Sequence, residues 1–432
     1  MLLNCSKLKN RLSQITELDE ETIELFVNKV QEFFSILEND IETANPNELL
    51  ELLSVLSTFN ELFDEESKWE ELIYRLLKKT NLNLQRLAYH PIYAYSGIGQ
   101  VALILNQIYS KRSDIKQLLF NVNELLCLNL NNYINLVDTS EFSDANTFEF
   151  IYGISGSLRH ILDFANEKNM LDISVKIVEL LITRSQDKNM NGYKVSGWCY
   201  LPSIKELKNL PNSAQNGVLN YSLSHGIGGP LVALSLAYKG GININGLRQT
   251  IDGLLDEYLH SFYYINDIIY WPGIITLEQY VGQLEVQKKQ REMSWCYGSI
   301  GILRAIYLSS VCISDKEHEL FAIREMEKIA GLRLRDFRLI SPIVCHGFAS
   351  VVSIMTEMYN DTGNVAFINM AQEQMYRCID YINSVDLQSI EKRSDGKVKK
   401  YCYLEGVSGI LQTIYSVLFC EESAHKKRIL IV

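Results

Sequence analysis

The chain has 432 residues, of which 47% are apolar and 22% are charged, and its net charge is −11 at pH 7. This acidic balance argues against a general nucleic-acid binder, because phosphate binding needs a basic surface. No apolar run reaches the ~18 residues of a membrane span, and the first residues lack the apolar region of a signal peptide. We therefore expect a cytoplasmic protein without a transmembrane segment.

The N-terminal region shows the apolar spacing of helices at residues 20–38 and 47–63. Further along the chain, one short pattern returns six times: a glycine turn of the form G-x-x-G, or a relative, followed by an apolar run at helical spacing. The copies are YSGIGQVALIL at Ser96, IYGISGSLRHIL at Gly153, SHGIGGPLVAL at Gly226, CYGSIGILRAI at Gly298, CHGFASVVSIM at Gly347 and LEGVSGILQTI at Gly406.

Amphipathic stretches such as residues 173–185 and 319–332 lie between the copies. Each unit is therefore interpreted as an outer amphipathic helix and an inner, largely buried helix that begins at the glycine turn. With a glycine-less pair in the N-terminal region, the pattern predicts seven helical pairs. Such pairs can stack as an open solenoid or close into a ring, and the spacing does not decide between them.

Two intervals depart from the helical period. Residues 188–224 are rich in Asn, Gly and Pro, and residues 258–293 are rich in β-branched and aromatic side chains, which favour strands. We interpret both as insertions that form a small extension containing β-structure, on the working face of the repeats.

Three of the glycine turns carry thiol or imidazole groups, at His225, at Cys296, and at Cys345 with His346. Because the turns are equivalent in the repeat, these side chains are expected to converge in space. Two thiolates and one imidazole suit zinc and leave a fourth position for water or substrate. The alternative is that these residues only pack in the core, as free cysteines commonly do. Nine scattered cysteines in a cytoplasmic protein favour reduced thiols over disulfides.

The motifs S-H-G-x-x-G-P, W-C-Y-G-x-x-G and C-H-G, in this order, resemble those of the lanthipeptide cyclases, the LanC-like family. The resemblance covers residues 96–409 and implies an all-α fold, an α/α toroid of about seven helical hairpins. It implies that residues 1–432 form a single catalytic domain, with the insertions 188–224 and 258–293 as the β-containing extension. It further implies one zinc ion per chain, bound by Cys296, Cys345 and His346.

The resemblance also implies roles for four other residues. His225 matches a histidine that acts in proton transfer, and Tyr297 follows the zinc cysteine as in the bacterial cyclases. Glu149 stands where the family usually has an aspartate, so a carboxylate is kept with one more methylene. Arg291 is the candidate for an arginine before W-C-Y-G, although Glu292 occupies the usual place.

The implied reaction is the addition of a cysteine thiol to dehydroalanine or dehydrobutyrine within one dehydrated, leader-bearing precursor peptide, forming the thioether rings of a lantibiotic. A dehydratase and an exporter are implied as partners, and their complex would bring the chain to the membrane surface. Three alternatives are a LanC-like enzyme that adds a small thiol such as glutathione to dehydrated proteins, a non-catalytic scaffold, and a glycoside hydrolase. The last would need a pair of carboxylates at the turns, and none stands out in the sequence.

Overall fold

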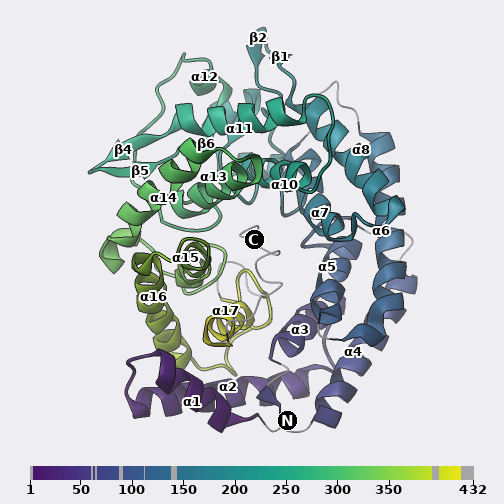
Figure 1. Ribbon diagram of the computed structural model, residues 1–432, viewed down its shortest axis with the longest axis vertical. Coiled ribbons are helices and arrows are strands. Elements are labelled where there is room, and N and C mark those ends of the chain that lie inside the picture. The colour runs from purple at the N-terminus through teal and green to yellow at the C-terminus, as the bar shows by residue number, and fades with distance from the viewer. Residues whose placement is uncertain are drawn as a thin grey trace. The chain divides into compact units, whose positions relative to one another are not determined.

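The computed structural model describes residues 3–59, 62–63, 66–86, 91–110, 112–137, 144–391 and 398–419. Its elements are mainly α-helices, with short strands near the middle of the chain (Figure 1). The chain divides into two compact units. Unit 1 contains the described parts of 1–90, 104–119 and 333–428, and unit 2 contains those of 91–103 and 120–332.

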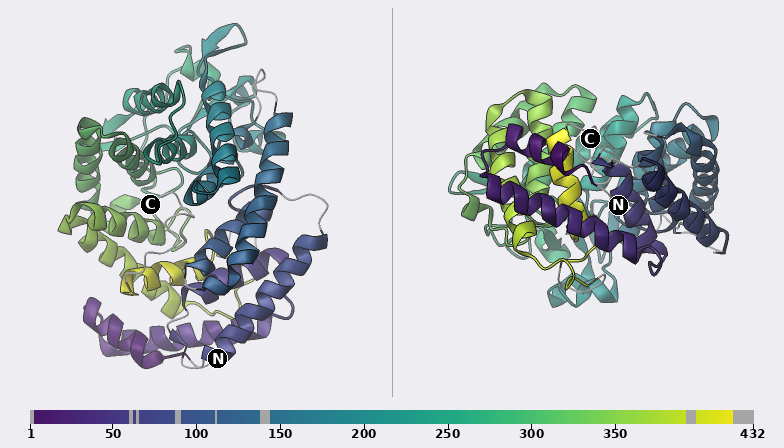
Figure 2. Two further views of the ribbon diagram at one scale, coloured as in Figure 1. Left: turned by 45° about the vertical axis from the view of Figure 1, so that its right-hand side comes forward. Right: turned by 90° about the horizontal axis from the view of Figure 1, so that it is seen from below.

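Unit 1 is built almost entirely from helices. Their bounds are α1 (Cys5–Ile15), α2 (Glu20–Asp40), α3 (Pro46–Thr58), α4 (Glu66–Arg86), the later part of α5 (Gly97–Tyr109), η2 (Ser113–Ile115), η6 (Leu334–Phe337), α15 (Phe348–Thr362), α16 (Val365–Ser384) and α17 (Val407–Phe419). Helices α15 and α16 form the most extensive pair, α2 packs on α16, and α3 packs on α17. Helix α1 contacts α17, so the start of the chain lies beside its last described helix (Figure 2).

The two helices predicted in the N-terminal region are confirmed as α2 and α3. Asp19 caps α2 by accepting a hydrogen bond from the Thr22 amide, and Asn45 forms a capping box with Glu48 at the start of α3. The predicted end of the second helix at residue 63 is wrong, because α3 ends at Thr58. Helices α1 and α4, which flank this pair, were not predicted.

Unit 2 repeats the alternation of inner and outer helices. Its helices are the first part of α5, most of α6 (Lys116–Leu136), η3 (Ala145–Thr147), α7 (Ile154–Ile161), η4 (Leu162–Phe164), α8 (Lys168–Ser185), α10 (Gly228–Lys239), α11 (Leu247–Ser261), α13 (Ser299–Ile313) and α14 (Lys316–Ala330). Helix α10 packs against α7, α11 and α13. Most residues of α10 and nearly all residues of α13 are buried, as predicted for the inner helices.

The strands all belong to the two insertions. Their bounds are β1 (Lys188–Met190), β2 (Tyr193–Val195), β3 (Val218–Asn220), β4 (Tyr263–Ile265), β5 (Ile268–Tyr270) and β6 (Ile274–Thr276), accompanied by the short helices α9 (Ile204–Leu207), η5 (Asn212–Asn216) and α12 (Leu277–Tyr280). Strands β1–β2 and β4–β5 are hairpins. Strand β3 pairs antiparallel with β6, with Leu219 opposite Ile275, so this pair joins the two insertions. The second insertion begins later than expected, because α11 continues to Ser261.

The glycines of the repeated turns allow a helix start to lie directly on its own turn. At Gly301 a side-chain carbon would overlap the carbonyl of Trp295, and at Gly409 it would overlap that of Tyr403, in both cases six residues earlier. Only a residue without a Cβ permits this approach. The repeated glycine therefore marks a backbone contact that recurs at the beginning of the inner helices.

Candidate functional site

The turns that precede α7, α10 and α13 are joined by backbone hydrogen bonds. The Phe150 amide donates to the Ser224 carbonyl at 3.2 Å, and the Leu223 amide donates to the Cys296 carbonyl at 2.9 Å. In each case the donor lies three residues before the first glycine of its turn, and the acceptor lies two residues before the first glycine of the next. Equivalent positions of these three turns are therefore adjacent within unit 2.

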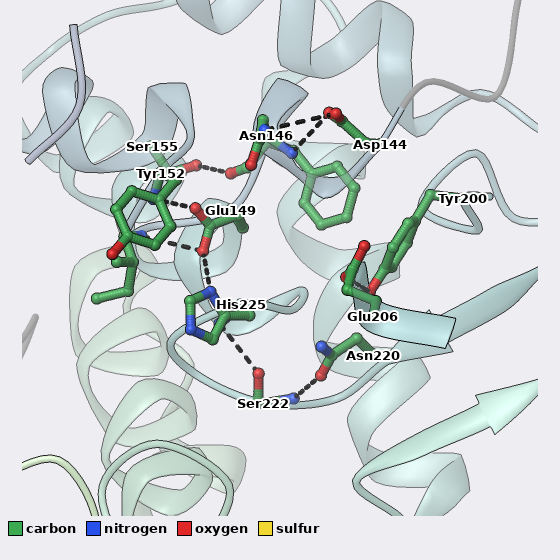
Figure 3. Close-up of polar contacts among 12 residues, drawn as sticks. Asp144, Asn146, Glu149, Tyr152, Ser155, Tyr200, Glu206, Asn220, Ser222 and His225 are labelled. Atoms are coloured by element: carbon green, nitrogen blue, oxygen red, sulfur yellow. Dashed lines mark hydrogen bonds and ion pairs between the residues drawn. The ribbon is translucent and has the colours of Figure 1, made fainter. Parts of the chain in front are cut away.

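Glu149 and His225 form a hydrogen-bonded pair across two of these turns (Figure 3). The His225 Nδ1 lies 2.7 Å from Oε2 of Glu149. The carboxylate is 1% exposed and also accepts hydrogen bonds from the Ile151 amide, at 3.1 Å, and from the Tyr152 amide. The His225 side chain is 39% exposed. A buried carboxylate thus fixes one ring nitrogen, and the other, Nε2, is directed away from it.

The two groups of this pair titrate above their ordinary ranges. Burial raises the pKa of Glu149, although the hydrogen bonds from His225 and from the two amides oppose this effect. Burial lowers the pKa of His225, but the hydrogen bond and the charge of Glu149, together with the Cys296 thiol, outweigh it, so the net pKa is raised. His225 consequently keeps its second proton to a higher pH than an ordinary histidine does.

A cavity of about 400 Å³ opens beside His225, with every lining residue in unit 2. Its lining also includes Glu149, Tyr152, Tyr297, Asp144, Asn146 and Glu206. Burial is the main cause that raises the pKa of Tyr297, so its hydroxyl stays protonated and able to donate a hydrogen bond at neutral pH. The cavity therefore presents an imidazole and a phenol together.

Cys296 and Cys345 occupy the same place in their turns, two residues before the glycine that precedes α13 and α15. Cys296 is buried, and its sulfur lies 3.8 Å from the Ser294 hydroxyl. In unit 1, Cys345 and His346 are partly exposed, and the Cys345 amide donates to the Leu404 carbonyl at 2.8 Å. Two cysteine thiols and one histidine imidazole are a combination of ligand types that could hold a metal ion.

Arg291 is not among the residues that line this cavity. Its guanidinium packs against Gly273, where a side-chain carbon would come within 2.7 Å of Nη1. Gly273 in turn accepts a hydrogen bond from the Tyr221 amide through its carbonyl. Arg291 thus supports the segment between β5 and β6, and its part in the chemistry stays a prediction.

Several cavity residues were not predicted, and one of them follows a rule visible in the sequence. We call the residue directly before the first glycine of each turn the pre-glycine position. The predicted site residues His225, Tyr297 and His346 all occupy it, and so does Tyr152, which the prediction overlooked. The last copy carries Glu405 there, and in the first copy, where Ser96 replaces the first glycine, the equivalent residue is Tyr95. Asp144 and Glu206 have no such signal, because they lie outside the repeated turns, Asp144 directly before η3 and Glu206 in the short helix α9.

No curated protein matches this chain by sequence. A solved structure of nisin cyclase is similar with a TM-score of 0.79 and 17% identity, over 94% of this chain and 98% of that one. This likeness confirms the predicted fold class, all-α and of the α/α-toroid type. Among the described residues, every helix is too short or too polar to cross a bilayer.

Residues 52–430 match the model of a family described as "Lanthionine synthetase C-like protein". This match spans most of the chain, and it agrees with the family resemblance seen in the glycine turns. The chain belongs to the lanthionine synthetase C-like family.

Proposed function

We propose that the chain is a zinc-dependent cyclase that adds cysteine thiols to dehydroalanine or dehydrobutyrine within one peptide. The observation that carries this proposal is the pair of Glu149 and His225 on a cavity, in a chain of this family whose neighbouring turns bear thiols. In the overall reaction the sulfur bonds to the β-carbon, the C=C bond is lost, and the α-carbon gains a proton.

The metal would be bound by Cys296, Cys345 and His346, with one zinc per chain. Two thiolates and one imidazole are a preferred zinc donor set, and three protein ligands leave one position open for a substrate. Zinc bound there would supply the Lewis acidity that ionises a substrate cysteine, whose free pKa is ~8.5, near neutral pH.

His225 would donate the proton that the α-carbon gains. In the imidazolium its Nδ1–H is engaged by Glu149, which leaves the Nε2–H for the substrate. A raised pKa keeps the imidazolium populated near neutral pH, as a general acid requires. Histidines that act as acid and base in other enzymes are likewise oriented by a buried carboxylate.

The enolate oxygen formed by attack at the β-carbon needs a hydrogen-bond donor. Tyr297 lines the cavity beside His225, and its protonated hydroxyl meets this need. Arg291 is the second candidate and the weaker one, because its guanidinium packs on Gly273.

The proposed substrate is a dehydrated, leader-bearing precursor peptide. A dehydratase and an exporter are the proposed partners, and the complex is proposed to assemble at the cytoplasmic side of the membrane.

The first test is zinc content per chain after gel filtration. We expect about one zinc in the wild type and little in Cys345→Ala, whereas Cys5→Ala, which removes another partly exposed thiol of unit 1, should keep its zinc. A folded wild type that neither contains nor takes up zinc contradicts the metal proposal.

The second test is ring formation in a dehydrated peptide that contains one cysteine. Ring closure leaves the peptide mass unchanged but removes its free thiol, so mass spectrometry after alkylation separates substrate from product. Addition of glutathione in place of ring closure would add the mass of glutathione and identify the small-thiol alternative.

A further inference from the structure

Tyr152 contacts the Glu149–His225 pair through both its ring and its backbone amide. Its ring stacks on the His225 imidazole, with centroids 6.2 Å apart and planes 24° apart (Figure 3). The Tyr93 ring meets the Tyr152 ring edge-on, with centroids 6.4 Å apart. Its amide donates a hydrogen bond to Glu149, the carboxylate that holds Nδ1 of His225. One residue thus contacts both members of the proton-transfer pair.

The exposure of Tyr152 is unusual for a large aromatic residue in a well-packed turn. The residue is 47% exposed, and its ring forms part of the cavity wall. Its pre-glycine position is equivalent to those of His225 and Tyr297, and a side chain there borders the cavity. The Tyr152 ring is therefore placed to limit the movement of the His225 imidazole.

A single hydrogen bond from Nδ1 does not fix an imidazole, because the ring can still swing about that bond. A stacked neighbour removes this freedom, since offset aromatic pairs are attractive at centroid distances of ~4.5–7 Å. We propose that Tyr152 is a positioning residue that fixes the plane of the His225 imidazole and thereby the direction of Nε2. Its effect on catalysis rests on the proposed function, whereas its effect on the imidazole does not.

The variants Tyr152→Leu and Tyr152→Gln remove the stack and keep the amide that binds Glu149. We expect kcat to fall ~10²-fold with little change in KM, the scale on which misplacement of a reacting group by 1 Å is felt. Tyr152→Phe keeps the ring and should retain most of kcat. Tyr264→Leu is the matched control, because Tyr264 is 44% exposed on β4 and is not among the residues lining the cavity.

A second readout does not depend on cyclase activity. Diethyl pyrocarbonate modifies histidine nitrogens, and the modification of His225 can be followed by mass spectrometry of its peptide, with exposed His260 as the internal reference. We expect several-fold faster modification of His225 in Tyr152→Leu and Tyr152→Gln, and an unchanged rate in Tyr152→Phe.

Unchanged modification of His225 in both ring-removing variants, with a wild-type melting temperature, overturns the proposal. Equal loss of kcat in Tyr152→Phe and Tyr152→Leu also overturns it, because the hydroxyl and not the stacked ring would then matter. If the wild type forms no rings, the proposed function fails, but the labelling rates still decide whether Tyr152 holds the imidazole.

Discussion

The imidazole of His225 and the thiols of Cys296 and Cys345 are held in different ways. Side chains hold His225: the Glu149 carboxylate forms a hydrogen bond with Nδ1, and the Tyr152 ring stacks on the imidazole. The two cysteines are placed by backbone, through the carbonyl of Cys296 and the amide of Cys345, each bonded to a neighbouring turn.

This difference in support indicates which substitutions should affect the His225 imidazole and which should affect the metal-ligand candidates. A side-chain change beside His225 should alter proton transfer and leave the metal ligands in place. A change that moves the backbone of a turn should alter the metal ligands and the stability of the helix together. Each prediction below separates these two outcomes.

The largest effect is expected for His225→Gln. Loss of the general acid should lower kcat by ~10²–10⁴-fold, while zinc content stays at the wild-type level because no metal donor is touched. His318→Gln is the control, since His318 also pairs with a carboxylate, Asp315 at 2.6 Å, but on α14. Loss of zinc in His225→Gln would contradict the separation of the two groups.

Glu149→Gln should have a smaller effect on the rate and a distinct effect on the pH profile. The hydrogen bond and charge of Glu149 raise the pKa of His225, and burial, which lowers it, remains in the variant. The pKa of His225 must therefore fall. Because the acid is active while protonated, the alkaline limb of kcat/KM should move to lower pH in the variant.

Glu149→Asp sharpens this prediction, because it keeps the charge with a shorter reach. We expect its alkaline limb between those of the wild type and Glu149→Gln. An alkaline limb that moves to higher pH in Glu149→Gln would show that His225 does not act in its protonated form.

The smallest effect is expected for Gly301→Ala, which tests the backbone. The added methyl would overlap the Trp295 carbonyl and displace the neighbouring Cys296. Overpacking of this kind costs about 1–3 kcal/mol, so both the melting temperature and the zinc content should fall.

Gly253→Ala is the matched control for this change. Gly253 lies inside α11, and a side-chain carbon there meets no heavy atom within 4 Å. An alanine at that point should stabilise the chain by about 0.5–1 kcal/mol. A lower melting temperature in Gly253→Ala than in Gly301→Ala would refute the role given to the close approach at Gly301.

Much of the fold could be predicted because the repeat makes the same physical demand at each copy. A glycine where a helix meets its own turn, followed by an apolar run, identified α5, α7, α10, α13, α15 and α17. Helices α1 and α4 carry no such mark and were missed. The pairing of β3 with β6 was also beyond the sequence, because three-residue strands contain too little alternation to fix a register.

The candidate site also contains residues that the repeat made predictable and residues that it did not. His225, Tyr297, Cys296, Cys345 and His346 stand at fixed places in the turns, so their spacing was informative. The hydrogen bonds of Glu149 to two amides and an imidazole depend on the folded turn, and only the family resemblance pointed to this residue. The contact of Arg291 with Gly273 comes from an irregular segment whose path no local pattern determines.

The pre-glycine position has a consequence for how such a chain can acquire chemistry. Six copies of one backbone turn carry Tyr95, Tyr152, His225, Tyr297, His346 and Glu405 there, three different side-chain types on the same support. A substitution at this position can therefore exchange the functional group while the loop around it is kept. Tyr95 and Glu405 are the two copies of this position at which a protein engineer could install a new group without replacing the proposed acid, its neighbours or a metal ligand.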